Sequence, residues 1–260
     1  MEFDAKNIRC GAFYLVNKIK RIIHTSKLAL SSCDLCGNTC QDHPLLCDYC
    51  SADLPKFNYQ LISADLLNWP AINKIIPKQS FDHLHSLAPH TWPYTQWITS
   101  LKYNGRFELA NLLGKLLCDS WNKSTNDFTA LYNGEAPELV LSVPLYVTKW
   151  QYRGYNQAHL IAKKFAKYSG IKYQHNAISR ILETDSQVGQ TGSQRRNNMK
   201  NAFHINATSS SFPQHVILID DVVTTGTTVN EISYLLKKHG VKTVTVLSIT
   251  ISLPENSHVV

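Results

Sequence analysis

The chain has 260 residues, of which 43% are hydrophobic and 17% are charged, and its formal net charge is +7. These proportions are typical of a folded protein and exclude an intrinsically disordered chain. No stretch approaches the roughly 18 uninterrupted apolar residues of a membrane span, so we expect a cytoplasmic protein without an integral membrane segment.

Residues 1–32 are predicted to form a basic amphipathic helix. Phe13, Val16, Ile19 and Ile22 recur near helical spacing, and Lys18 interrupts the apolar run. Such a helix usually docks on a neighbouring domain, and a membrane-surface role is the alternative.

Residues 33–55 are predicted to form a small zinc-binding module. Two C-x-x-C pairs lie ten residues apart, and Gly37 follows the first pair directly; their members are Cys33, Cys36, Cys47 and Cys50. Four thiolates at this spacing suit a structural Zn²⁺ that supports folding or partner docking. Disulfide pairing is the alternative, and Cys40 or His43 could replace one ligand. Cys10 and Cys118 are predicted to be buried thiols.

Residues 56–79 are predicted to be a connector because three prolines divide them into short pieces. Residues 80–253 are predicted to be an α/β domain, and residues 254–260 a frayed tail. The predicted strands of this α/β domain cover 81–86, 139–143, 216–219 and 244–249. Its predicted helices cover 94–103, 106–121, 158–169 and 227–239. Strands that alternate with helices indicate a Rossmann-like, doubly wound parallel sheet. In the first strand, buried and exposed residues should alternate. His83 and His85 should share one face of that strand, and neither should have a carboxylate partner.

A possible anion site follows the third predicted strand. The strand is expected to end at Ile219 and the helix to start near Thr227; the candidate residues are Asp220, Asp221, Val222, Val223, Thr224, Thr225, Gly226, Thr227 and Thr228. Hydroxyls and helix N-terminal N–H groups can hold a phosphate, and Gly226 allows close approach of the backbone. Carboxylates accept hydrogen bonds from a sugar diol, so the combination predicts a ribose phosphate. A strand-end acid pair with an N-capping threonine is the alternative.

The positive charge is concentrated in residues 149–200, which hold ten basic residues and two acidic ones. This distribution suits a polyanion, either a diphosphate or a nucleic acid. Lys149, Arg153 and Asn156 follow the strand that ends near Val143, where they could face a diphosphate carrying Mg²⁺. The structural alternative is a turn at Gly154 and a helix cap at Asn156.

At these residues the chain resembles the ComF family of competence-associated, phosphoribosyltransferase-like proteins. The resemblance rests on the C-x-x-C pairs and on five further blocks: Leu101–Gly105, Val143–Leu145, Arg153–Gln157, the stretch from Gln187 to Phe203, and Val216–Val229. It implies the type I phosphoribosyltransferase fold, with Asp220 and Asp221 on the ribose hydroxyls, Thr224–Thr228 on the 5-phosphate, and Lys149 and Arg153 toward the diphosphate.

The resemblance also implies a mobile hood over the ligand. The candidates for hood or DNA contacts are Gln187, Arg195, Arg196, Asn198, Lys200, Tyr152 and Tyr155. Gln190 and Ser193 depart from the family pattern, which usually has a hydrophobic and a further basic residue in this stretch.

Three functions of different class follow. The first, from the resemblance, is binding of phosphoribosyl diphosphate and single-stranded DNA during DNA uptake, with DNA-uptake or recombination proteins as partners. The second is an active phosphoribosyltransferase acting on a nucleobase-like acceptor, and the third is an adaptor that acts through its cysteine module. No catalytic residue is assigned, and His159, His175 and His204 are predicted to be isolated structural or surface histidines.

Overall fold

The computed structural model describes residues 31–76, 79–128, 136–182, 201–206 and 212–254. The predicted N-terminal helix, the hood and the tail lie in the other ranges, outside the described residues. The chain divides into two compact units, Met1–Leu54 and Pro55–Val260, and each is described by itself. No helix in the described ranges has both the length and the apolarity that a membrane crossing requires.

The second unit is built on a five-stranded sheet whose strands are all parallel. In spatial order these are β1 (His83–Pro89), β7 (Thr243–Ile251), β6 (His215–Val223), β2 (Leu139–Ser142) and β3 (Lys172–Tyr173). A separate antiparallel pair is formed by β4 (Ile178–Arg180) and β5 (Phe203–Ile205). The predicted parallel α/β sheet is therefore confirmed.

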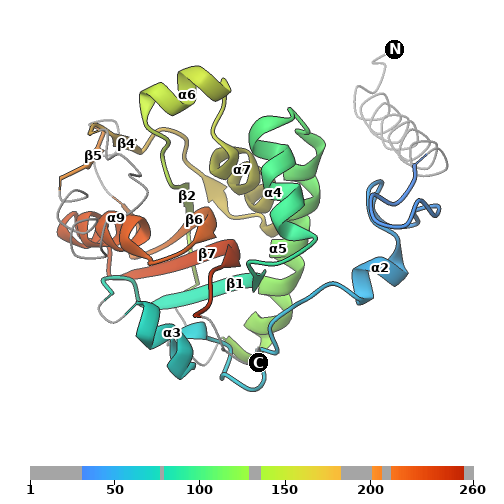
Figure 1. The fold of residues 1–260 in the computed structure, drawn as a ribbon. Helices are drawn as coiled ribbons and strands as arrows, with labels where there is room; N and C mark the ends of the chain where they lie inside the picture. The colour runs from blue at the N-terminus through green and yellow to red at the C-terminus, as the bar shows by residue number, and fades with distance from the viewer. Residues whose placement is uncertain (1–30, 77–78, 129–135, 183–200, 207–211, 255–260) are drawn as a thin grey trace, which may run out of the picture. The chain divides into compact units, whose positions relative to one another are not determined.

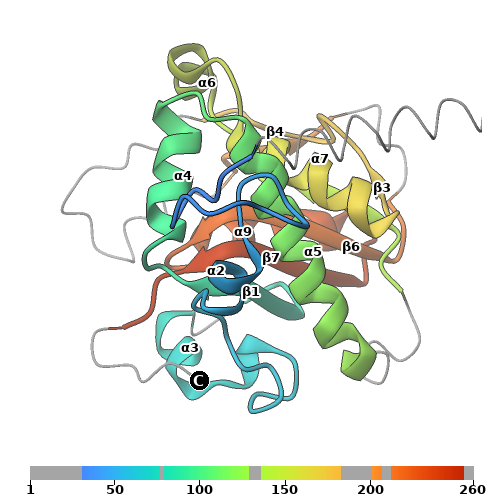
Figure 2. The same cartoon turned by 90° about the vertical axis from the view of Figure 1, so that its right-hand side faces the viewer.

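Helices cover both faces of the sheet. α4 (Tyr94–Tyr103), α5 (Glu108–Phe128) and α7 (Gln157–Ser169) lie on one face, and α9 (Thr227–Lys238) lies on the other (Figure 1). Figure 2, viewed from the first of these faces, shows α5 and α7 in front of the strands. The shorter helices of this unit are η1 (Leu66–Asn68), α3 (Pro70–Ile75) and α6 (Val147–Arg153).

The order of the strands places a topological switch point between β2 and β6. From β2 the chain runs through α7 to β3 on one side, and from β6 through α9 to β7 on the other. Right-handed crossovers in opposite directions put α7 and α9 on opposite faces. In open α/β sheets ligands bind at the carboxyl ends of the strands at such a point. The loops after β2 and β6 are therefore the first places to look for a ligand.

Two predicted strands differ from those observed. β6 does not end at Ile219 but continues through Val223, because Asp220, Val222 and Val223 still pair with β7. β1 does not alternate between buried and exposed residues, since every residue after His83 is buried. Its polar residues, including His85 and Ser86, are enclosed by neighbouring segments.

The segment predicted as a connector, residues 56–79, belongs to the core of this unit. Phe57, Ile62, Leu66, Ile72 and Ile76 are buried in the same hydrophobic cluster as the strands. We therefore place the beginning of the domain at the boundary after Leu54 rather than at residue 80.

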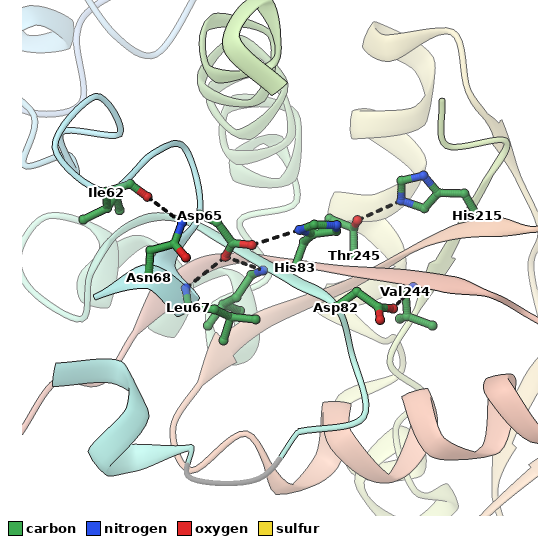
Figure 3. Close-up of polar contacts among 10 residues, drawn as sticks. Ile62, Asp65, Leu67, Asn68, Asp82, His83, His215, Val244 and Thr245 are labelled. Carbon is green, nitrogen blue, oxygen red and sulfur yellow. Dashed lines mark hydrogen bonds and ion pairs between the residues drawn. The ribbon is translucent and has the colours of Figure 1, made fainter. Parts of the chain in front are cut away.

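The same segment also covers the outer edge of β1. Asp65 Oδ1 accepts hydrogen bonds from the N–H groups of Leu84 at 3.1 Å and Leu67 at 2.9 Å (Figure 3). The Tyr59 hydroxyl accepts from Ser86 N at 2.8 Å and donates to Ser86 O at 2.6 Å. These side chains satisfy backbone groups that an edge strand would otherwise expose. His83, predicted to have no carboxylate partner, lies 2.9 Å from Asp65 Oδ2, so that prediction is wrong.

His85 makes the stability of the fold sensitive to acid. Its ring stacks on Tyr59 at 4.1 Å, and burial lowers the pKa of the imidazole to about 3. The unfolded chain regains an ordinary pKa near 6.5, so it takes up a proton that the folded chain refuses. We expect the unfolding free energy to fall by about 1.4 kcal/mol per pH unit as the pH drops below 6.5, until the pH nears the folded value.

Urea unfolding at several pH values between 7 and 4 measures this loss. His85→Phe keeps an aromatic ring between Tyr59 and Trp121 and removes the titration. The difference in stability between the two proteins should therefore change with pH. A constant difference would mean that the pKa of His85 is the same in the folded and the unfolded chain.

Candidate functional site

A loop rich in threonine connects β6 to α9 at the switch point. Asp220 and residues 222–229 line a hollow of about 40 Å³. A single water needs ~10–15 Å³ of such space, so the hollow suits a phosphoryl group better than a whole nucleotide. Thr225 and Thr227 face each other with their hydroxyl oxygens 2.9 Å apart. The N–H groups of the first turn of α9 have no intrahelical partners and can hold an anion.

Gly226 is the N-cap of α9 and adopts a left-handed conformation with φ of +69°. A Cβ atom here would lie 2.9 Å from the side chain of Ile76, which belongs to the buried 56–79 segment. The sequence suggested that this glycine leaves room for a ligand. In the structure it also leaves room for a core side chain that supports the loop from behind.

The two adjacent aspartates start from opposite faces of the sheet, as consecutive residues of a strand do, although their carboxyl groups still interact with each other. Asp220 lines the threonine hollow. Asp221 is 4% exposed and points toward α4 and α7. The structure thus brings Asp220 together with the threonines but separates Asp221 from them.

Asp221 is held by a lysine and a glutamine. Its Oδ2 forms an ion pair with Lys102 Nζ at the end of α4, and its Oδ1 accepts a hydrogen bond from Gln157 Nε2 at 3.0 Å. The sequence analysis gave neither Lys102 nor Gln157 a role. Both lie in blocks that carried the family resemblance, Leu101–Gly105 and Arg153–Gln157. The presence of both residues in those blocks was the signal from which a role for them could have been predicted.

The two carboxyl groups titrate differently because their surroundings differ. Burial and the negative charge of Asp221 raise the pKa of Asp220 well above its usual range. Burial also acts to raise the pKa of Asp221. The positive charge of Lys102 and the hydrogen bonds from Gln157 and Lys102 outweigh that effect and leave the pKa lowered. Such divergence within an adjacent pair is frequent at functional sites.

The predicted diphosphate-facing residues lie on α6 and at the start of α7. Arg153 Nη1 donates to Gln157 Oε1, and its guanidinium lies 5.0 Å from the centre of the Tyr103 ring. Arg153, Gln157, Asp221 and Lys102 therefore form one connected polar chain. Lys149 is exposed on α6.

Asn156 has a structural role. Its Oδ1 accepts from Ala158 N at 3.0 Å and caps α7, while its Nδ2 donates to Val143 O at 2.8 Å. Gly154 ends α6 in the left-handed conformation. These features match the alternative of a turn and a helix cap at this block. Arg153 keeps its position toward the β2–β6 switch point.

Exposed aromatic side chains gather around the same elements. Tyr152 is 86% exposed and Trp150 52% exposed, both on α6. Tyr103, which lies under Arg153, is 61% exposed. Tyr155 is half-buried, and its ring lies 4.6 Å from that of the exposed Phe107. We refer to Tyr103, Phe107, Trp150, Tyr152 and Tyr155 as the aromatic group.

The hood candidates Gln187, Arg195, Arg196, Asn198 and Lys200 lie outside the described residues. Two histidines predicted to be isolated are in contact, because the rings of His159 and His175 lie 4.4 Å apart. That prediction is wrong because the short strand β3 brings residue 175 back beside α7.

The four predicted metal ligands of the first unit come together. The Sγ atoms of Cys33, Cys36, Cys47 and Cys50 all lie within 4.8 Å of one another. A tetrahedral zinc with bonds of about 2.3 Å needs sulfur atoms about 3.8 Å apart, so the cluster could hold such an ion. Gly37 has a φ of +76° and forms the expected tight turn after the first pair. Cys40 is buried outside the cluster, and His43 Nδ1 accepts from Leu45 N at 3.2 Å.

One thiol of the cluster, that of Cys33, is shifted toward the thiolate form. Burial acts to raise the pKa of Cys33, but hydrogen bonds from the backbone N–H groups of Cys47, Leu35 and Cys36 lower it to about 6. A metal binds the thiolate rather than the thiol. The donor set and the spacing both fit a closed structural site around α2 (Asp48–Ala52).

A doubly wound sheet with an acid and threonine loop at its switch point defines a phosphoribosyltransferase-like protein. In agreement, the Phosphoribosyl transferase domain model matches residues 153–251. Competence protein F of Haemophilus influenzae is 32% identical over 205 residues, 77% of this chain and 88% of that protein. DNA utilization protein YhgH of Salmonella typhimurium is 31% identical over 222 residues, 84% of this chain and 91% of that protein.

The chain therefore belongs to the ComF family of phosphoribosyltransferase-like proteins. Among solved structures, a hypoxanthine phosphoribosyltransferase from Staphylococcus aureus is similar with a TM-score of 0.35 and 15% identity, over 54% of this chain and 64% of that one. That likeness is too distant to carry functional detail.

Proposed function

We propose that this protein binds phosphoribosyl diphosphate with Mg²⁺, and single-stranded DNA, and acts in DNA uptake or processing during natural transformation. The family relationship and the names of its relatives support the biological setting. The observation that carries the ligand proposal is the hollow where Asp220 meets the threonine loop at the start of α9.

Each part of the ligand has a matching group. The hydroxyls of Thr224–Thr228 and the N–H groups of α9 suit a 5-phosphate, and Asp220 can accept hydrogen bonds from the ribose hydroxyls. Arg153 can grip diphosphate oxygens, since a guanidinium binds them in bidentate fashion. Mg²⁺ would neutralise the diphosphate while keeping most of its water. Calorimetric titration of the full chain with phosphoribosyl diphosphate and Mg²⁺ tests the proposal, and no measurable heat of binding would refute it.

The aromatic group supports binding of single-stranded DNA. Aromatic rings interleaved with cations form stacking platforms for unpaired bases, and here Arg153 and Lys149 accompany the rings of Tyr103, Trp150 and Tyr152. Arg195 and Arg196 add charge in the sequence and remain candidates for phosphate contacts.

We expect Tyr152→Ala to weaken binding of a 20-nucleotide oligodeoxythymidylate about tenfold, because loss of one base stack costs ~1–3 kcal/mol. Affinity should also fall steeply between 50 and 200 mM salt. Fluorescence anisotropy measures both effects. Tyr234→Ala on α9, which also removes an exposed tyrosine, is the control and should bind as wild type. Equal losses in the two variants would argue against a platform on α6.

An active phosphoribosyltransferase is the alternative, and the intact acid and threonine loop favours it. Transfer of the phosphoribosyl group needs positioning and charge neutralisation more than a catalytic base. Release of diphosphate with one member of a nucleobase panel, lost in Asp220→Asn, would establish it.

The cysteine cluster is proposed to bind one structural Zn²⁺ per chain. We expect Cys33→Ser to lose the metal and the ordered structure of the first unit, because a structural zinc supplies much of the folding free energy of such modules. Cys40→Ser removes a buried thiol outside the cluster and should keep the metal. Elemental analysis of the purified variants measures the stoichiometry. Metal loss in both would exclude the four-thiolate assignment.

A further inference from the structure

A second cavity, of about 660 Å³, lies beside β2 in the domain of residues 55–260. Its walls come from the end of β2 and the segment after it, α6, the start of α7, the segment that joins β3 to β4, β4 itself and Asn206. It shares no lining residue with the threonine hollow. Its volume falls within the roughly 300–1,000 Å³ of small-molecule sites. Of its lining residues, only Trp150 and Tyr155, which belong to the aromatic group, have a part in the proposed function.

The charge of the wall suits a ligand with one anionic group. Among the lining residues that the structure describes, Arg180 is the only permanently charged side chain and none is a carboxylate. Its guanidinium lies 5.7 Å from the centre of the Phe203 ring, on the partner strand β5. A guanidinium in an acid-free wall matches a phosphate monoester.

The two contacting histidines form a polar edge of the same cavity. His159 Nδ1 lies 2.7 Å from the Tyr173 hydroxyl, which in turn lies 3.0 Å from Ser142 Oγ. Burial, His175 and Lys163 together lower the pKa of His159 to about 4. A neutral imidazole both donates and accepts hydrogen bonds, as the edge of a heterocyclic base requires. It is poorly suited to binding a second anion.

Apolar and aromatic groups complete the wall. Trp150 is half exposed at the cavity, and Leu141, Leu145 and Ile178 contribute apolar surface. An indole ring is a preferred stacking partner of a nucleobase. The cavity thus combines a stacking ring, a neutral hydrogen-bonding edge and one cation.

From this combination we propose that the cavity binds a nucleoside monophosphate, with the base against Trp150 and the histidine pair and the phosphate toward Arg180. Two sources share this chemistry, a free nucleotide and a nucleotide unit of single-stranded DNA. The second source rests on the proposed binding of single strands.

The test is calorimetric titration of the full chain with deoxyadenosine monophosphate in saturating phosphoribosyl diphosphate and Mg²⁺. The added ligand fills the threonine hollow, where a 5-phosphate could otherwise compete. We expect Trp150→Ala to weaken nucleotide binding at least about tenfold. Tyr234→Ala removes an exposed aromatic ring that does not line the cavity, so it should bind the nucleotide as wild type. Arg180→Gln should weaken binding of the nucleotide but not of deoxyadenosine.

The outcomes separate this site from the proposed function. Asp220→Asn should lose phosphoribosyl diphosphate and keep the nucleotide. If Arg180→Gln also weakens oligodeoxythymidylate binding, the strand is the source, and if it spares that binding, the free nucleotide is. No nucleotide binding by wild type, displacement by phosphoribosyl diphosphate, or equal loss in Tyr234→Ala would overturn the proposal.

Discussion

Asp220→Asn is expected to weaken binding of phosphoribosyl diphosphate by about tenfold to a hundredfold. Asp220 is the carboxyl group that lines the threonine hollow, and a buried ligand hydroxyl left without its acceptor costs about 1–3 kcal/mol. An amide keeps the shape of the side chain but replaces one acceptor with a donor. Calorimetry in the presence of Mg²⁺ measures the change.

The fold should survive this substitution, which makes the result interpretable. Burial and the charge of Asp221 raise the pKa of Asp220. A carboxyl group whose pKa is higher in the folded chain than in the unfolded chain contributes its full stabilisation at pH values below the unfolded pKa. It loses that contribution as the pH rises through the folded pKa. Relative to wild type, Asp220→Asn should therefore gain stability as the pH rises. If Asp220→Asn bound phosphoribosyl diphosphate with wild-type affinity, Asp220 would not belong to the binding site.

Asp221→Asn is the matched comparison. Asp221 points away from the hollow toward Lys102 and Gln157, so its amide variant should lose less affinity and more stability than Asp220→Asn. If the two variants behaved alike, the two side chains would act as one ligand pair, as the sequence first suggested.

Lys102→Met is expected to lower the unfolding free energy by about 3 kcal/mol at pH 8. The substitution leaves the carboxylate of Asp221, which is 4% exposed, without its cation. Removal of one partner of a buried ion pair typically costs 3–5 kcal/mol, and the partial exposure of Lys102 places the loss at the lower end. Urea unfolding followed by circular dichroism measures it.

The pH dependence identifies the cause. In wild type the pKa of Asp221 is lowered, so its stabilising contribution is present above the usual carboxyl value near 4 and is lost as the pH falls through the folded value. Without Lys102, burial should raise that pKa, and protonation should relieve the cost in acid. The deficit of Lys102→Met should therefore be smaller at pH 5 than at pH 8.

A double variant provides the control. Lys102→Met with Asp221→Asn removes both charges, and it should recover most of the stability that Lys102→Met loses. A deficit that neither changes with pH nor recovers in the double variant would show that the methionine acts through packing instead.

Local sequence patterns determined much of this protein. The apolar run of β6, the acid and threonine loop and the start of α9 are consecutive in the chain, so their order alone predicts a strand, an anion loop and a helix. The cysteine cluster was predictable for the same reason, because each C-x-x-C pair is local and only one short loop joins the two. Alternation of strands and helices was enough to predict the parallel sheet.

Contacts between distant segments were decided only by the tertiary structure. Lys102 meets Asp221, and Tyr59 and Asp65 cover the edge of β1, although no local pattern links these residues. A two-residue periodicity places Asp220 and Asp221 on opposite faces once the strand continues past Ile219, but the pairing with β7 decides whether it continues. Sequence thus determined which groups are available. Packing of the sheet decided which of them line the threonine hollow and which neutralise one another.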